Sequence, residues 1–175
     1  DDKGIAYDTI MLADPLKKLL ITSKFGIRKH PITGEEKMHY GIDLAADINT
    51  PVFAIADGII DFIGMNGDFG KYILLSHTNT VQSAYAHLNK FSNDLSVGSF
   101  VKKSDSIGYT GNSGLSTGPH LHFEILENKK RIDPAKIDKI NKNKYLGDVE
   151  INQFNKSKRK IQEEINKIRP RAISQ

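Results

Sequence analysis

Short apolar runs separated by polar turns dominate most of the chain. Residues 50–64 (TPVFAIADGIIDFIG) are rich in β-branched and aromatic residues, and Asp57-Gly58 in their middle indicates a turn or a β-bulge. Residues 71–77 and 81–88 are two apolar runs joined by a short polar turn, which predicts a β-hairpin. Short strands joined by such turns are typical of a small antiparallel barrel or sandwich.

The segment 120–126 (HLHFEIL) predicts a further strand, whose side chains alternate between two faces. One face carries His120, His122, Glu124 and Leu126. Residues 98–111 form two shorter apolar runs interrupted by Ser-Asp, and residues 15–21 (PLKKLLI) fit either a short strand or a helix. The sequence therefore predicts a mainly β fold, a small antiparallel β barrel-sandwich, over its central part.

The character of the sequence changes after residue 135. Residues 141–148 are polar, and residues 151–170 have apolar positions at helical spacing before Pro170. The apolar stripe consists of Phe154, Ile161, Ile165 and Ile168. We expect this stripe to dock on its own domain, with binding to a partner helix as the alternative. The expected parts are a lead-in segment (1–21), a central domain (22–135) and a basic, partly helical C-terminal extension (136–175).

The composition limits the chemistry available to the chain. None of its 175 residues is cysteine, which excludes a disulfide framework and any thiolate metal site. A metal ion would therefore have to be held by histidine and carboxylate side chains. No apolar run approaches the ~20 residues that a membrane-spanning helix needs, and the polar N-terminus does not resemble a signal peptide.

The net charge of +4 is unevenly distributed. Residues 136–175 carry eleven Lys/Arg against five Asp/Glu, whereas residues 1–135 carry fourteen against sixteen. The extension, with a net charge of +6, is either a solvated helix face or a surface for an anionic polymer, lipid or nucleic acid. The strands lack the interleaved basic and aromatic residues of single-strand binding platforms, so we expect no nucleic-acid partner.

Histidine and aspartate lie where strand-like sequence meets glycine or a turn. An ideal strand separates the Cα atoms of His39 and Asp43 by about 13 Å, so a bend near Gly41 is needed for both to bind one metal. In a strand, His120 and His122 point the same way, about 6.6 Å apart. With His39 and Asp43, one of them completes the two-histidine, one-carboxylate set of a catalytic zinc site with an open fourth position.

The remaining imidazoles then have a role beside such a metal. His87, which should share a strand face with Tyr85, and the other histidine of the 120/122 pair would act on a metal-bound water as acid or base. The alternative is that the paired histidines are solvated on an open face. We expect His30, in a turn before proline, and His77, at the tip of the hairpin, to be solvated.

Three segments, taken in order, resemble a known family. They are FGIRKHPITGEEKMHYGIDLAADINTPVFAIADGII (25–60), YAHL (85–88) and GYTGNSGLSTGPHLHFEI (108–125). Over about residues 22–135 the chain closely resembles the lysostaphin-type (LytM-like) zinc endopeptidases, which cut peptidoglycan cross-bridges. The combination of H-x-x-x-D, A-H-L and H-L-H, with S-T-G-P before the last, makes this resemblance specific.

The resemblance implies one zinc ion (Zn²⁺) per chain and a role for each residue of the site. The zinc ligands would be His39, Asp43 and His122. The catalytic histidines that do not bind zinc would be His87 and His120. Loops 28–37 and 111–118 would form the two sides of a groove over the zinc. The substrate-binding residues expected in these loops are Arg28, Asn112, Ser116 and Thr117. Glu124 is interpreted either as a partner of a ligand or as an ordinary barrel residue.

The same resemblance implies a zinc-dependent endopeptidase that hydrolyses the peptide cross-links of bacterial peptidoglycan. The R-K-H-P-I-T-G run favours a D,D-endopeptidase acting on D-alanyl-diaminopimelate bridges over an enzyme that cuts polyglycine. The alternative is a catalytically silent, wall-binding regulator of other hydrolases, but the complete set of ligands and histidines favours the enzyme. A related barrel that relays phosphoryl groups between two histidines would not need Asp43.

The implied substrate also sets the expected location and partner. We expect a monomer that binds peptidoglycan in the bacterial cell envelope, in the periplasm or at the wall. The basic extension would then hold the enzyme on anionic wall polymers. The role of residues 1–20 is left open by the sequence; one interpretation is that they are the remnant of an inhibitory or membrane-anchoring region, the rest of which is missing from this chain.

Overall fold

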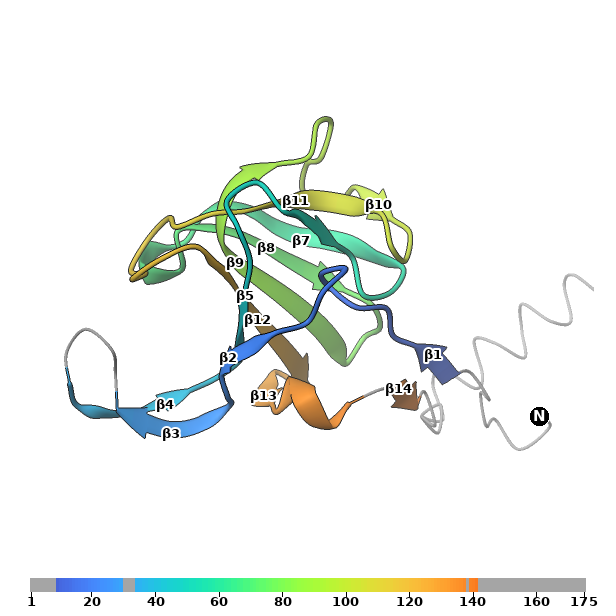
Figure 1. Cartoon of the computed structure of the whole chain (residues 1–175). Helices are drawn as coiled ribbons and strands as arrows, with labels where there is room; N and C mark the ends of the chain where they lie inside the picture. Colours follow the sequence, from blue (N-terminus) through green and yellow to red (C-terminus); the bar gives the residue numbers. More distant parts are fainter. Residues whose placement is uncertain (1–8, 30–33, 138, 142–175) are drawn as a thin grey trace, which may run out of the picture. The chain divides into compact units, whose positions relative to one another are not determined.

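The computed structural model describes residues 9–29, 34–137 and 139–141, which are mainly β (Figure 1). The chain divides into two compact units, one of Met11–Ile140 and one of Asp1–Ile10 with Asn141–Gln175. Strands β1 (Thr9–Met11) and β14 (Lys139–Asn141) form a two-stranded sheet.

A ten-stranded antiparallel sheet dominates the larger unit. Seven strands follow the order β10-β7-β8-β9-β12-β5-β2, while β11 pairs with β9 and β6, and β13 pairs with β12. The strands are β2 (Ile21–Ser23), β5 (Ile42–Ala45), β6 (Pro51–Phe53), β7 (Gly58–Met65), β8 (Lys71–Ser76), β9 (Val81–Phe91), β10 (Phe100–Val101), β11 (Ser106–Thr110), β12 (His120–Glu127) and β13 (Lys130–Ile132). A separate hairpin joins β3 (Gly26–Lys29) to β4 (Glu36–His39), and η1 (Gly67–Phe69) and η2 (Pro134–Lys136) are 3₁₀ turns.

The sheet branches along its longest strand, β9. Residues 81–86 of β9 pair with β12, whereas residues 88–91 pair with β11. The branch therefore falls at His87, between the two ladders. His87 thus lies between the two ladders, and its ring packs against His120 and His122.

The core lies on the face of β12 opposite its histidines. Leu121, Phe123 and Ile125 alternate with the polar positions of this strand, and each is buried. Across the ladder Leu121 lies opposite Leu44, and the Phe123 ring packs against Tyr85. Burying one side chain of this size stabilises the fold by about 1.5–3 kcal/mol. Core packing therefore fixes the face on which each histidine of β12 lies.

The strands expected from the sequence are present. The predicted hairpin is formed by β8 and β9, Asp57-Gly58 marks the turn into β7, and residues 98–111 contain β10 and β11. Residues 15–20 are irregular, with Leu16 buried, before β2 begins. The mainly β antiparallel fold is thereby confirmed. The helical extension lies outside the described residues, and the three-part division of the chain stays a prediction.

The bend needed between His39 and Asp43 occurs at Gly41. β4 ends at His39 and pairs with β3, whereas β5 pairs with β12, so the two segments belong to different sheets. A Cβ atom at position 41 would lie 2.4 Å from the Phe123 carbonyl oxygen and 2.9 Å from Cε1 of His122. Glycine is required here because a side chain would collide with the neighbouring strand.

We expect Gly41→Ala to lower the free energy of unfolding by about 1–3 kcal/mol, because the added methyl group overlaps a backbone that is already paired. Urea denaturation followed by circular dichroism measures the change. Gly118→Ala is the matched control for stability, since a Cβ at position 118 meets nothing within 4 Å. Equal stability of the two variants would show that the bend does not depend on this close approach.

His77 differs from the expectation that it is solvated. Its ring is half-buried; Nδ1 donates to the Asp57 carbonyl oxygen (2.8 Å), and Nε2 lies 2.7 Å from the Ser83 hydroxyl oxygen. Burial lowers the pKa of His77 below its ordinary value, although Asp57 and Asp61 partly oppose this shift. The other histidine expected to be solvated, His30, lies outside the described residues.

The lowered pKa of His77 makes stability depend on pH. The unfolded chain binds the proton more readily than the folded protein, so this contribution is present above pH ~6.5 and is lost as pH falls through the folded-state pKa. Between about pH 7.5 and about pH 5, we expect urea denaturation to show a larger loss of unfolding free energy for the wild type than for His77→Gln. Parallel pH profiles would refute this role of His77.

Candidate metal centre

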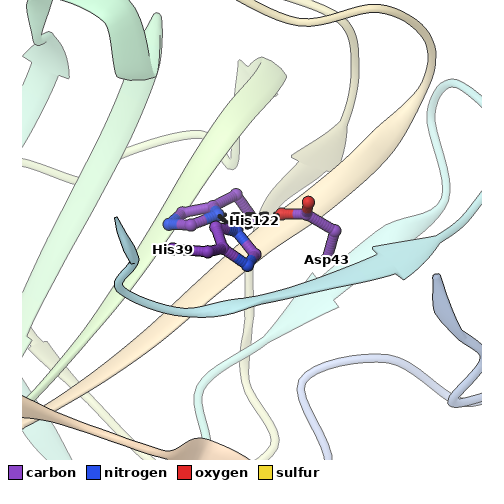
Figure 2. Close-up of side chains that lie close together, drawn as sticks. All are labelled: His39, Asp43 and His122. Atoms are coloured by element: carbon purple, nitrogen blue, oxygen red, sulfur yellow. Dashed lines mark hydrogen bonds and ion pairs between the residues drawn. The ribbon is translucent and has the colours of Figure 1, made fainter. Parts of the chain in front are cut away.

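Three side chains from separate strands converge at one point (Figure 2). His39 ends β4, Asp43 lies in β5, and the β5–β12 ladder places Asp43 directly opposite His122. His39 Nε2 lies 3.1 Å from Asp43 Oδ1 and 3.1 Å from His122 Nδ1. Asp43 Oδ1 and His122 Nδ1 are 2.8 Å apart. The fold thus brings together the ligand set implied by the sequence.

This triangle has the size and the chemistry of a zinc site. Zinc with tetrahedral bonds of ~2.0–2.1 Å separates neighbouring ligand atoms by about 3.3 Å, close to the distances found here. Two imidazole nitrogens and a carboxylate oxygen are ligands that zinc accepts, and three protein ligands leave a fourth position open. A cation between the atoms explains why two nitrogen lone pairs turn toward each other and toward a carboxylate. His39, Asp43 and His122 form the metal site.

Hydrogen bonds behind the two histidine ligands fix which ring nitrogen carries the proton. His39 Nδ1 donates to the Lys24 carbonyl oxygen (2.8 Å), and His122 Nε2 donates to Glu124 Oε1 (3.1 Å). His39 Nε2 and His122 Nδ1 are therefore left with free lone pairs, and both point into the metal site. Both rings are buried, with 7% and 6% of their surface exposed, so the rings have little freedom to turn away.

The electrostatics of the site favour a bound cation. Arg28 Nη2 donates to Asp43 Oδ2 (3.3 Å) and leaves Oδ1 for the metal. Burial disfavours the charged carboxylate, but when His122 and His39 are also protonated on the atoms that face it, their hydrogen bonds outweigh burial and hold the pKa of Asp43 far below its usual range. Burial also disfavours a charged His122, yet hydrogen bonds to Asp43 and Glu124 outweigh it and raise the pKa of that ring. Positive charge beside Asp43 and Glu124 is therefore favourable, and a bound divalent ion supplies it.

His87 and His120 lie beside the metal site, with ring centroids 4.8 Å apart. His87 Nδ1 donates to the Ser113 carbonyl oxygen and His120 Nδ1 to the Gly118 carbonyl oxygen, both at 2.8 Å. Each ring therefore keeps Nε2 as a proton acceptor. The Nε2 atom of His120 lies 3.6 Å from Oδ1 of the carboxylate ligand.

A bulge in β9 turns His87 into the site. Tyr85 lies opposite Ile73 and Leu88 opposite Lys71, so β9 has one more residue than β8 between these pairs. His87 lies in this bulge with a φ of 57°, a left-handed conformation that is costly for a residue with a side chain. The expectation that His87 shares a face with Tyr85 is wrong, because Tyr85 is fully buried in the core.

A cavity of about 250 Å³ opens over the metal site. Its apolar lining consists of Met38, Tyr40, Phe69 and Leu115. Of the four residues expected to bind substrate, Arg28, Ser116 and Thr117 line this cavity, whereas Asn112 is exposed and lies outside its lining. Ser116 Oγ lies 3.2 Å from His120 Nδ1. The substrate contacts of these residues stay predictions.

The sequence did not decide the place of Glu124, and it gave no signal for Arg131. Glu124 lies two residues beyond His122 on the same face of β12, which was the available signal. Arg131 Nε donates to Glu124 Oε2 (2.8 Å), and Arg131 reaches this position only because β13 pairs with β12. Local spacing cannot reveal such a contact between strands.

We expect the purified protein to bind one zinc ion per chain through Asp43 and its two histidine partners. Zinc at about 100 times its dissociation constant should stabilise the metal-free protein by about 2.7 kcal/mol, seen as a rise in melting temperature. Asp43→Asn should lose this rise, because the amide carries no charge. Asp94→Asn, an exposed aspartate in a loop, is the matched control. If zinc does not change the melting temperature of the wild type, the proposed metal site is ruled out.

Comparison with known proteins identifies the family. Residues 37–134 match peptidase family M23. The DD-carboxypeptidase/endopeptidase Mpg of Neisseria meningitidis is 43% identical over 124 residues, which are 71% of this chain and 28% of that protein. The peptidoglycan DD-endopeptidase ShyC of Vibrio cholerae is 35% identical over 139 residues, 79% of this chain and 32% of that protein. The chain spans about a third of the length of these curated relatives.

Solved structures show the same likeness. A zinc-containing peptidase from Vibrio cholerae aligns with a TM-score of 0.65 and 36% identity over 71% of this chain and 39% of that chain. The catalytic domain of lysostaphin from Staphylococcus simulans aligns with a TM-score of 0.60 and 34% identity over 67% of this chain and 90% of that chain. With the His39–Asp43–His122 metal site in place, the chain belongs to peptidase family M23.

Proposed function

We propose that the chain is the catalytic domain of a zinc-dependent endopeptidase that hydrolyses peptide cross-links of bacterial peptidoglycan. The observation that carries this proposal is the placement of three metal ligands and two further imidazoles around one cavity. Relatives named as peptidoglycan DD-endopeptidases support the substrate class. The alternative of a silent regulator has less support, since such a protein needs neither the ligands nor the two extra histidines.

The chain's own residues account for proton transfer. His39, Asp43 and His122 would hold zinc, which when bound supplies a Lewis acid for the scissile carbonyl and activates a water. One of His87 and His120 accepts a proton from the attacking water at Nε2, because its Nδ1 is already protonated and bound to a backbone carbonyl. A protonated ring then donates to the leaving amine, so the proton passes from water to product within this pair.

The environment of His87 suits this exchange. Burial, together with the neighbouring His120 and His122 rings, lowers the pKa of His87 to about 4, although its hydrogen bond to Ser113 opposes the shift. The ring is therefore neutral at neutral pH and is a weak base. Once protonated, a ring with so low a pKa gives up the proton readily, which favours its transfer to an amine.

We further propose that the bond cut is the D-alanyl-diaminopimelate cross-link. Arg28 and Lys37 line the cavity over the metal, and Lys29 joins Arg28 in a neighbouring cavity. Diaminopimelate carries a free carboxylate beside the scissile bond, whereas a polyglycine bridge carries no charged side chain. These basic side chains, in a lining that also holds Asp43, Asp68 and Glu124, support the D,D substrate, in agreement with the names of the relatives.

The substrate class implies a location in the cell envelope. We propose that the protein works as a monomer, in the periplasm or at the wall, and that its basic extension adds affinity for anionic wall polymers. Within the part of the chain that the structure describes, no helix has both the length and the apolar character needed to span a membrane.

With a muramidase present to cut the glycan strands, we expect the zinc-loaded protein to release monomeric in place of cross-linked muropeptides from purified sacculi whose cross-links are D-alanyl-diaminopimelate, as identified by mass. His87→Ala and His120→Ala should each slow this release by about 10²–10⁴-fold while zinc content stays at one per chain, because they remove proton transfer and not a ligand. His77→Gln, assayed near pH 7.5, is the control histidine distant from the site. Undiminished release after chelation, or by His120→Ala, would refute the mechanism.

A further inference from the structure

A buried carboxylate stands behind the metal ligand His122. Glu124 lies on the same face of β12, and none of its surface is exposed. Its Oε1 accepts from His122 Nε2 (3.1 Å), and its Oε2 accepts from Arg131 Nε (2.8 Å). Both oxygens of Glu124 are thus engaged, one toward the metal site and one away from it.

Arg131 is itself held in place from a second direction. Its guanidinium Cζ lies 5.3 Å from the centre of the Tyr40 ring, a distance at which a cation and an aromatic face attract. Tyr40 directly follows the ligand His39 in the chain. The guanidinium of Arg131 is therefore also in contact with the segment that carries the ligand His39.

A merely structural role does not explain this pair well. Taking the Glu124 carboxylate out of water is costly, and an apolar residue of similar volume often stabilises a fold as much or more. The next residue on this face of β12, Leu126, is apolar and packs against Tyr72, Ala84 and Ala86. The ion pair provides a hydrogen-bond acceptor for Nε2 of His122. An apolar side chain cannot provide one.

The acceptor matters because a neutral imidazole has two tautomers. Only the tautomer with the proton on Nε2 leaves Nδ1 free, and Nδ1 is the atom that lies 3.1 Å from His39 Nε2 and 2.8 Å from Asp43 Oδ1. The other two buried rings of the site, His39 and His87, use backbone carbonyl oxygens as acceptors. His122 alone has a charged one, which makes its ring a stronger donor of electron density to a metal.

We infer that Glu124, held by Arg131, is a positioning residue that fixes the tautomer of His122 and strengthens its bond to the metal. The inference rests on the proposed zinc-dependent function. Glu124 acts through His122 and is not proposed to touch substrate. Arg131 holds the charged, buried carboxylate of Glu124 in the orientation that accepts from His122. Both residues therefore act on the metal through His122.

The test is the affinity for zinc alone, measured by competition between the metal-free protein and a chromophoric chelator. Glu124→Gln should weaken zinc binding by about 10–100-fold, the range found when such carboxylate partners of ligands are changed. Arg131→Gln should weaken binding in the same direction, and Arg131→Lys, which keeps the charge, should weaken it less. The double variant Glu124→Gln/Arg131→Gln should lose no more than the larger single loss, because the two residues act in series.

A spectroscopic measurement separates positioning from a loss of stability. In cobalt-substituted protein, Glu124→Gln should shift the visible absorption bands, since these depend on the ligand field at the metal. Glu127→Gln is the matched control: it lies on the same strand, is exposed, and should change neither zinc affinity nor the cobalt spectrum. A structural role alone would lower the melting temperature of the metal-free protein and leave both readouts at wild-type values.

The outcomes separate this inference from the proposed function. Wild-type zinc affinity and cobalt spectrum in a folded Glu124→Gln variant would overturn the inference, even if the protein digests sacculi. If Glu124→Gln does not fold, Arg131→Gln decides in the same way, because Arg131 lies partly in solvent. A zinc-loaded wild type that does not digest sacculi would overturn the proposed function and leave the affinity result standing.

Discussion

The antiparallel register between β5 and β12 is the constraint on which the site depends. It sets His122 opposite Asp43, two residues that are 79 positions apart in the chain, and in the same ladder it sets Leu121 opposite Leu44 in the core. Because side chains alternate, a shift of one residue would carry His122 into the core and expose Leu121. Core packing and metal binding therefore require the same register between β5 and β12.

Around this ladder, the five functional side chains are held by partners on their outer side. Backbone carbonyl oxygens accept from His39, His87 and His120, while Glu124 accepts from His122 and Arg28 donates to Asp43. Carbonyl groups are fixed by the strands and loops that carry them, so these rings gain their orientation from the fold itself. The charged partners act on the two ligands that face each other across the ladder, where the charge on the metal must be balanced.

The sequence predicted those features that depend on local alternation. The β8–β9 hairpin, the strand 120–126 and the bend at Gly41 follow from residue type and spacing, and the structure contains them. The face of His87 could not be found in this way, because a bulge with φ of 57° interrupts the alternation. Arg131 and the buried bonds of His77 depend on pairing between strands, which spacing along one segment does not reveal.

The same register explains why two histidines one residue apart do different work. His122 lies opposite Asp43, whereas His120 lies opposite Ala45, one step further along the ladder toward the loop 111–118. Spacing alone left open which of the pair binds the metal, since both point to the same face. The register between β5 and β12 distinguishes the two histidines. Nδ1 of His122 lies 2.8 Å from Asp43 Oδ1, whereas Nε2 of His120 lies 3.6 Å from that atom and Nδ1 of His120 donates to the Gly118 carbonyl oxygen. A His-x-His strand beside an aspartate thus yields one metal ligand and one imidazole beside the metal site, provided that the aspartate lies opposite the second histidine.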